Sequence, residues 1–258
     1  MGILNTTPDS FYSDSRTDSD ADVLMRAERM IADGADILDF GGQSTRPGAV
    51  RIDAPTEMKR VLPAIKLVRE HFPEICISID TFYSEVAGAA FHAGANIIND
   101  ISGGTMDANM FSTAAQLKLP YVLTHIQGEP QTMQNNPTYN DVVAEVLNHL
   151  NEKIAVLNSA GAEQIVIDPG FGFGKTMQQN LRLLKELHLF GALNYPLLAG
   201  LSRKKTLQQL VNRDSSQTLN ATTVANTIAL MHGASIIRVH DVREANEART
   251  IVEAMNRA

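Results

Sequence analysis

The sequence predicts a single-domain (β/α)₈ TIM barrel, and three observations favour this fold class. Eight short apolar segments each end in a polar or charged residue, and the stretches between them are long enough to form a helix. Strand-then-helix units repeated eight times are typical of a barrel of parallel strands. The length of 258 residues suits one such barrel. We therefore expect residues 1–258 to form one domain, with its functional side chains at the carboxyl ends of the strands.

The eight apolar segments are the expected strands. Short apolar runs suit strands that are buried on both faces, as in a parallel sheet. The segments are residues 2–5, 37–42, 75–80, 97–102, 121–125, 165–170, 196–202 and 236–241.

The segments between the strands are expected to be helices with an apolar face toward the barrel. Val143, Val146, Leu147 and Leu150 recur at helical spacing and share one face of the longest of them. Four of these segments are followed by a Gly-Ala pair, predicted to mark the turn into the next strand, because a glycine just past a helix can adopt the left-handed conformation that ends it. The pairs are at 34–35, 94–95, 161–162 and 233–234.

The composition argues against nucleic acid and membranes as partners. The 22 Lys and Arg residues are outnumbered by 29 Asp and Glu residues, which gives a formal net charge of −7 without any basic run. No apolar stretch approaches the ~20 residues that cross a bilayer, and no signal peptide is evident. Cys76 is the only cysteine and is expected to be an inert core thiol. These features favour a soluble, cytoplasmic protein.

One apparent phosphate-binding motif fails on its spacing. Gly174-Lys175-Thr176 ends like a Walker A loop. That loop needs a further glycine five positions before Gly174, where this chain has Pro169. We therefore do not expect a P-loop.

Three long polar loops follow predicted strand ends. They are residues 8–19, 43–55 and 126–140, and they are rich in Gly, Pro, Asp, Asn or Ser. Loops of this length inside a compact domain are usually functional or mobile. We expect them to act as lids on the face of the barrel that carries the active site.

The strand ends carry two groups of opposite chemistry, of which the first is acidic. Asp80, Asn99, Asp100 and Asp168 follow the third, fourth and sixth strands. A carboxylate can accept two parallel hydrogen bonds from a planar N–C–N edge, as it does from guanidinium. Asp80, Asn99 and Asp168 therefore suit a flat nitrogen heterocycle rich in N–H donors. Asp100 could equally serve only to cap a turn.

The second group is basic. Arg203, Lys204, Arg238 and His240 follow the seventh and eighth strands, where barrels often bind phosphate. Arg238 and His240 alternate along a strand and so share one side. Because burying two basic groups there without partners would be costly, an anion site is favoured. Asp241 could begin the last helix, whose N-terminal partial charge would add to such a site, or could simply cap that helix. The two groups indicate a nitrogen heterocycle that carries phosphate.

Two further positions allow both a functional and a structural interpretation. Asp168 begins a glycine-rich stretch, residues 168–174, whose glycines would let the backbone approach a ligand but also fit an ordinary tight turn. His125 ends the fifth strand and suits a structural hydrogen bond as well as it suits a ligand contact.

Several segments resemble the dihydropteroate synthase family. Residues 2–11 and 41–48 resemble its two signature loops. Later motifs match in order, at residues 78–81, 99–100, 168–176, 200–204 and 238–241. The resemblance covers essentially all 258 residues, and the ordered set of motifs is highly specific.

The resemblance implies a homodimeric transferase of folate biosynthesis that requires Mg²⁺. Members of the family join 6-hydroxymethyl-7,8-dihydropterin diphosphate to p-aminobenzoate, and they release pyrophosphate. The pterin ring stabilises the methylene cation that forms when the C–O bond breaks, so no covalent enzyme intermediate is expected. The sequence shows no evident Ser-His or Cys-His nucleophile pair.

The resemblance also implies roles for individual residues. The polar edge of the pterin would be held by Asp80, Asn99, Asp168 and Lys204, with Arg238 on its face. The diphosphate would be held by Asn5, Arg238 and His240, and Asn5 would also contact the metal. The p-aminobenzoate pocket would be formed by Phe11, Thr45, Arg46, Phe173 and Lys204. The catalytic set would be Asn5, Asp9, Lys204, Arg238 and His240.

Three positions depart from the family pattern, and two other functions share the barrel. Thr124 stands where methionine often lines the pterin site, Lys205 where serine is common, and Gln43 where glutamate is common. A corrinoid-linked, pterin-binding methyltransferase should not need the Thr-Arg pair at 45–46 or the Ser-Arg-Lys turn at 202–204. A catalytically silent homologue would bind pterin without turnover, and the intact basic group argues against it.

Overall fold

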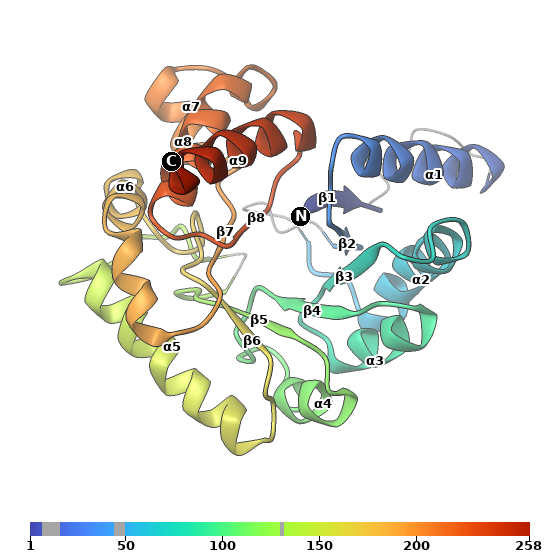
Figure 1. The fold of residues 1–258 in the computed structure, drawn as a ribbon. Coiled ribbons are helices and arrows are strands. Elements are labelled where there is room, and N and C mark those ends of the chain that lie inside the picture. The colour runs from blue at the N-terminus through green and yellow to red at the C-terminus, as the bar shows by residue number, and fades with distance from the viewer. Residues whose placement is uncertain (7–15, 44–49, 130–131) are drawn as a thin grey trace.

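Eight parallel strands form the centre of the protein, and helices surround them (Figure 1). The structure is a computed structural model that describes residues 1–6, 16–43, 50–129 and 132–258, with side chains from residue 20 onward in the first helix. The strands are β1 (Gly2–Asn5), β2 (Ile37–Gly41), β3 (Cys76–Asp80), β4 (Ile97–Asp100), β5 (Tyr121–Thr124), β6 (Ile165–Asp168), β7 (Leu198–Ala199) and β8 (Ile236–Ile237).

Helices follow the strands around the outside of this ring, as the apolar spacing predicts. The α-helices are α1 (Arg16–Ala32), α2 (Ala54–His71), α3 (Ser84–Ala93), α4 (Met110–Leu117), α5 (Val142–Ser159), α6 (Met177–Lys185), α7 (Lys205–Val211), α8 (Leu219–Met231) and α9 (Val242–Arg257). Two 3₁₀ segments, η2 (Leu187–Leu193) and η3 (Ser215–Gln217), lie after α6 and α7. Both α7 and α8 lie between β7 and β8, one helix more than a minimal strand–helix repeat needs.

The ring of strands is closed. Strands β1 to β6 pair in sequence order, and β7 pairs with β8. Parallel bridges between Ile167 and Leu197 and between Gly2 and Val239 join these two sheets at both edges. The predicted (β/α)₈ barrel is therefore confirmed.

The last two strands are much shorter than predicted. Residues 196–202 and 236–241 were expected to be strands, but regular pairing covers two residues of each. The backbone beyond β8 stays bonded to both neighbours, because the N–H of Arg238 donates to Ala199 and that of Val239 donates to Met1, at 3.0 and 2.9 Å. These bonds hold the chain at the ring beyond Ile237, where the regular pairing of β8 ends.

Two apolar layers hold the barrel together. Inside the ring, Met1, Ile97, Val122 and Leu198 pack with partly buried residues from the other strands, Cys76 among them. Between the ring and the helices lies a larger core that includes Val143, Val146 and Leu150, as predicted for that face of α5. Burial raises the pKa of the Cys76 thiol, in keeping with the inert core thiol that the sequence predicts.

The Gly-Ala pairs lie at turns from helix to strand, as predicted. Gly34, Gly94, Gly161 and Gly233 all have a positive φ, at 97°, 115°, 93° and 96°. Gly94 ends α3 directly, and its N–H donates to the last turn of that helix. In the described part of the chain, no helix combines the length and the apolar character needed to span a membrane.

Candidate active site

A guanidinium group at the end of β8 joins acidic residues from two other strands. Arg238 Nε lies 2.6 Å from Oδ2 of Asp39, and its Nη2 lies 2.6 Å from Oδ2 of Asp80. The amide of Asn99 donates to the same oxygen of Asp39 at 3.1 Å. The barrel therefore brings together Asp80, Asn99 and Arg238, all three predicted as site residues.

Asp39 is a site residue that the sequence analysis missed. It lies in the middle of β2, it is 0% exposed, and its Oδ1 has no hydrogen-bond partner among the described residues. The available signal was a lone carboxylate in an apolar strand, two residues from Ile37 and Gly41 and so on the same side as both. A buried carboxylate in such a strand needs a cation, and Arg238 supplies it.

Asp168 and Lys204 add a third carboxylate and a second cation to the site. Asp168 ends β6, and its Oδ1 accepts from the N–H of Gly170 at 2.7 Å. Lys204 donates to the carbonyl of Phe171, and its Nζ lies 4.3 Å from the centre of the Phe173 ring. Lys204 therefore contacts the same loop that begins at Asp168.

Burial shifts the titration of these groups. It lowers the pKa of Lys204 to about 8, although Asp168 and Asp80 oppose the shift. It raises the pKa of Asp80, against the opposing charge of Arg238, and it also raises the pKa of Asp168. Acids and cations thus act on one another across one rim, which suits a flat ligand that donates hydrogen bonds and carries an anion.

Two strand-end residues have structural partners instead. Asp100 accepts hydrogen bonds from the hydroxyl of Tyr121 and from the N–H groups of Ser102 and Gly104, at 2.6, 2.7 and 2.8 Å. These bonds favour the turn-capping alternative for Asp100. His125 is buried, and its Nδ1 lies 2.9 Å from Nζ of Lys175.

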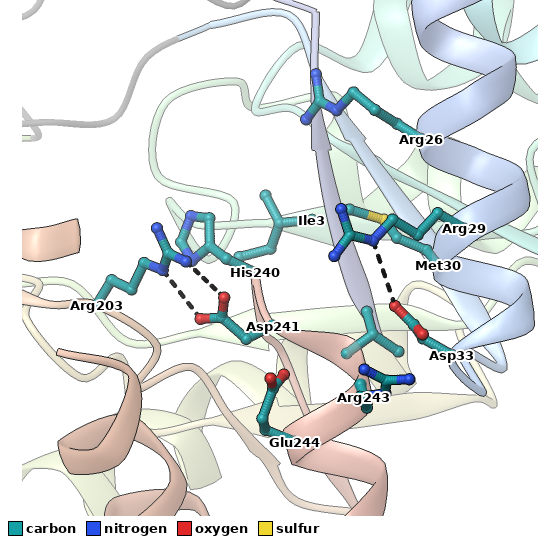
Figure 2. A pocket seen from close by; sticks show the side chains of 11 residues that line it. Ile3, Arg26, Arg29, Met30, Asp33, Arg203, His240, Asp241, Arg243 and Glu244 are labelled. Atoms are coloured by element: carbon teal, nitrogen blue, oxygen red, sulfur yellow. Dashed lines mark hydrogen bonds and ion pairs between the residues drawn. The ribbon is translucent and has the colours of Figure 1, made fainter. Parts of the chain in front are cut away.

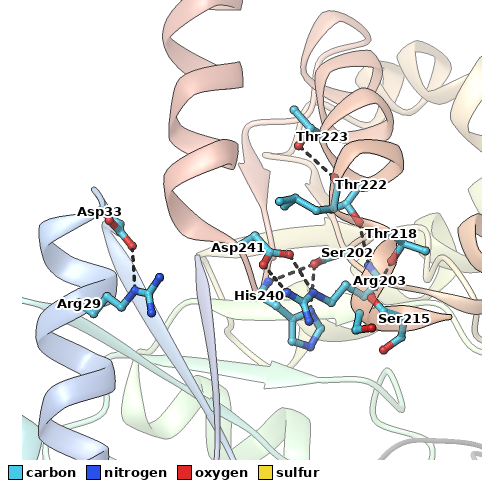
Figure 3. Close-up of polar contacts among 12 residues, drawn as sticks. Arg29, Asp33, Ser202, Arg203, Ser215, Thr218, Thr222, Thr223, His240 and Asp241 are labelled. Atoms are coloured by element: carbon cyan, nitrogen blue, oxygen red, sulfur yellow. Dashed lines mark hydrogen bonds and ion pairs between the residues drawn. The ribbon is translucent and has the colours of Figure 1, made fainter. Parts of the chain in front are cut away.

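His240 is paired with Ser202, a contact that the sequence does not reveal. Ser202 Oγ lies 2.9 Å from Nδ1 of His240 and accepts from the N–H of the same residue at 3.1 Å (Figure 3). The hydroxyl has one hydrogen to donate, and in the tautomer in which Nδ1 accepts it the ring hydrogen of His240 is on Nε2. In that tautomer His240 is a donor at Nε2. The sequence could not show it, because 38 positions separate the two residues.

A cavity of about 380 Å³ adjoins His240 (Figure 2). Its lining includes Arg26, Arg29, Arg203, Arg243, His240 and Asp241. Arg203, predicted to belong to a free basic group, instead forms a two-point ion pair with Asp241, at 2.5 and 2.9 Å. Asp241 immediately precedes α9, but its carboxylate binds Arg203 and makes no capping bond.

Asn5 lies at the same rim as the acids. A methyl group added at Gly41 would lie 3.2 Å from Oδ1 of Asn5 and 3.8 Å from Oδ2 of Asp80, so both side chains border the space beside Gly41. In the described segments, no three His, Cys, Asp or Glu side chains form a metal-binding group. Mg²⁺ is commonly held by one or two protein oxygens together with substrate phosphates, so the oxygen of Asn5 fits that ion.

Comparison with known proteins decides the family. A family model described as "Pterin binding enzyme" matches residues 1–240. The chain belongs to the pterin-binding enzyme family.

Several of the relatives are dihydropteroate synthases. The Escherichia coli K12 dihydropteroate synthase is 45% identical over 256 residues, covering 98% of this chain and 90% of the relative. Two solved dihydropteroate synthases are each 38% identical with a TM-score of 0.93: that of Yersinia pestis with a sulfonamide drug complex, covering 100% of this chain and 94% of that one, and that of Xanthomonas albilineans with 4-aminobenzoic acid, covering 100% and 92%. The resemblance to this family of transferases is confirmed.

Several residues implied by the pterin-binding family lie outside the described part of the chain. They are Asp9, Phe11, Thr45 and Arg46. Phe173 is described, and it is buried beneath Lys204.

The three departures from the family pattern have different surroundings. Thr124 is buried and its hydroxyl has no partner among the described residues. Lys205 is exposed at the start of α7. Gln43 accepts a hydrogen bond from the N–H of Ile52 at 2.9 Å, so it joins the end of β2 to the segment just before α2.

Proposed function

We propose that this enzyme joins 6-hydroxymethyl-7,8-dihydropterin diphosphate to p-aminobenzoate, forming 7,8-dihydropteroate and pyrophosphate in folate biosynthesis. The arrangement around Arg238 carries the proposal, because buried acids for a donor-rich heterocycle lie beside cations for its leaving group. The solved relatives with 4-aminobenzoic acid and with pteroic acid support the same substrates.

The pterin would bind through its polar edge. Asp80, Asn99, Asp168 and Lys204 would hold that edge, with Arg238 against the ring. We add Asp39, whose buried Oδ1 has no partner among the described residues and can accept an N–H from the ring. Carboxylates at this position also favour positive charge that develops on the pterin as the C–O bond breaks.

Departure of pyrophosphate needs stabilisation of negative charge. Arg238, His240 and Asn5 would hold the diphosphate, with the Nε2 hydrogen of His240 directed by Ser202. Mg²⁺, when bound through Asn5 and the substrate phosphates, supplies Lewis-acid charge compensation. The bonding electrons leave with pyrophosphate, and the methylene carbon becomes a resonance-stabilised cation.

The second substrate completes the reaction. Phe173 and Lys204, with Phe11, Thr45 and Arg46 from the two signature loops, would form the p-aminobenzoate pocket. Its neutral amine attacks the methylene carbon and then loses one proton to solvent. Closure of the loops, including Asp9, would keep water from capturing the cation. The Ser202–His240 pair orients a phosphate ligand in this scheme and forms no covalent intermediate.

A turnover assay tests the proposal. Purified protein is mixed with the pterin diphosphate, p-aminobenzoate and Mg²⁺, and both dihydropteroate and pyrophosphate are followed. Both products should form together and should require p-aminobenzoate. Pyrophosphate release that ignores omission of p-aminobenzoate would exclude the reaction, and pterin binding without turnover would indicate a silent homologue.

The proposal includes a cytoplasmic homodimer, as the resemblance implies. Light scattering of the purified protein should give twice the chain mass, and cell fractionation should recover the activity without membranes. A monomeric mass at micromolar concentration would contradict the dimer.

A further inference from the structure

The protein contains a buried lysine that the proposed reaction leaves unused. Lys175 follows the glycine-rich stretch after β6, and it is 2% exposed. Lysine is almost never fully buried unless its charge is compensated. Burial lowers the pKa of Lys175 well below its usual value, and nearby Asp168 opposes the shift. The partners of this ammonium group therefore indicate what the residue does.

The ammonium group is bound mainly by its own loop. Nζ donates to the carbonyls of Gly170 and Phe173, at 2.9 and 3.0 Å. It also lies 2.9 Å from Nδ1 of His125, which must accept because an ammonium group has no lone pair. Burial, with the charge of Lys175, lowers the pKa of His125 to about 2 and keeps that nitrogen unprotonated. The three hydrogens of Lys175 are thus all used.

The peptide groups that Lys175 binds belong to the same loop as the proposed substrate contacts Asp168 and Phe173. The N–H of Gly170 donates to Asp168 while its carbonyl accepts from Lys175, so the peptide groups on both sides of Gly170 are fixed. Lys175 also binds the carbonyl of Phe173, and the ring of that residue lies against Lys204. One buried group therefore connects the residues assigned to the two substrates.

Lys175 is also one of three cations that act on Asp168. Burial raises the pKa of Asp168, and Lys204, Lys175 and Arg238 each lower it. Arg238 and Lys204 belong to the substrate site, where a ligand competes for their bonds. Lys175 is enclosed by its loop and by His125, so its charge acts on Asp168 whether or not a ligand is bound.

We propose that Lys175 is a positioning residue for this reaction and acts through the loop of residues 168–174. Its hydrogen bonds orient the Asp168 carboxylate and the Phe173 ring toward the two substrates. Its charge opposes the rise in the pKa of Asp168 that burial causes, and so favours the carboxylate form that accepts N–H groups of the pterin. The inference rests on the proposed function, which assigns Asp168 to the pterin and Phe173 to p-aminobenzoate. A role confined to stability is the competing explanation.

Two substitutions separate the hydrogen bonds from the charge. Lys175→Met keeps the length of the side chain but removes both, whereas Lys175→Gln removes the charge and keeps an NH₂ donor. Lys185→Met, at an exposed position in the last turn of α6, is the matched control. Calorimetric binding of 6-hydroxymethylpterin over a range of pH reports on Asp168, and the KM for p-aminobenzoate reports on Phe173. Urea unfolding followed by circular dichroism reports on stability.

We expect Lys175→Met to weaken pterin binding about tenfold or more and to raise the KM for p-aminobenzoate, because the loop loses its internal donors. Lys175→Gln should bind pterin as the wild type does at alkaline pH. As the solution is acidified, the pterin affinity of this variant should begin to fall at a higher pH than that of the wild type. The reason is that Asp168 holds its proton more tightly without Lys175. Lys185→Met should leave all three measurements unchanged.

Two outcomes would overturn the proposal. In one, both variants match the wild type in pterin affinity, in the pH at which that affinity falls on acidification, and in the KM for p-aminobenzoate. In the other, unfolding free energy falls while affinity, pH profile and KM stay unchanged, which assigns Lys175 to stability alone. If Lys175→Met fails to fold, the Lys175→Gln profile decides. Wild-type protein that binds the pterin but forms no dihydropteroate would refute the proposed function instead, and the binding profile would still test Lys175.

Discussion

A buried carboxyl group in α2 offers a direct test of the electrostatics around the site. Glu57 is 1% exposed; one of its oxygens accepts from the hydroxyl of Thr81 at 3.0 Å, and the other has no partner among the described residues. Burial raises the pKa of Glu57 from 4.5 to about 8, and the charge of Asp80 adds to the increase. The group is therefore protonated in the folded protein at neutral pH, and Glu57→Gln replaces it with a neutral side chain of the same shape.

The sign of the effect follows from proton linkage. Between pH 4.5 and about 8 the folded protein holds a proton that the unfolded chain has released, so the stability of the wild type falls as pH rises through that window. The glutamine variant lacks this term. Each pH unit is worth about 1.4 kcal/mol, so the variant should gain up to about 5 kcal/mol over the wild type across the window.

The assay is urea unfolding of both proteins at about pH 5, 6.5 and 8.5, followed by circular dichroism because the chain has no tryptophan. Taking the difference between the two proteins cancels the contributions of other titrating groups. Glu70→Gln, at an exposed position of the same helix, is the control and should show no such trend. A stability difference between Glu57→Gln and wild type that stays constant with pH would refute the reasoning.

Three other substitutions test contacts of the site. Arg238→Ala removes the counter-charge of the carboxylates of Asp39 and Asp80, so it should lower the free energy of unfolding by roughly 3–5 kcal/mol. It should also abolish use of the pterin diphosphate. A variant as stable as the wild type would contradict the ion pairs. Ser202→Ala should raise the KM for the pterin diphosphate severalfold with little change in unfolding, because the ring of His240 loses its orientation; an unchanged KM would exclude this role. Gly170→Ala should lower the thermal midpoint by several degrees, because its Cβ would lie 1.8 Å from the carbonyl oxygen of His125 and φ is +70°; a midpoint unchanged in a thermal scan would refute that packing.

The barrel and its acidic rim could be predicted from the sequence because both follow from local patterns. Apolar runs and Gly-Ala turns located the strands within two residues at their starts, and the residues that end those runs included Asp80, Asn99 and Asp168. Parallel strands place such ends on one side of a barrel whatever the helices between them do. Strand order and the position of the rim therefore needed no knowledge of side-chain contacts.

The pairing of charges could not be predicted, because it depends on contacts between strands far apart in the chain. Arg238 was expected to hold an anion, and the sequence did not show that its guanidinium also binds Asp39 and Asp80, 199 and 158 positions away. Arg203 was assigned to the same basic group, yet Asp241 neutralises it. Sequence spacing reports which residues share a strand face, and not which opposite charge lies across the ring.

The Oδ1 atom of Asp39, which has no partner in the part of the chain that the structure describes, would affect which pteridines the proposed site accepts. A ring N–H that reached this atom would gain a hydrogen bond, whereas an isostere with an ether oxygen or a C–H at that point would leave the carboxylate dehydrated. Such a mismatch is worth about 1–3 kcal/mol, or roughly 5- to 150-fold in affinity. Recognition of the correct heterocycle would thus be enforced by penalising analogues that lack one hydrogen.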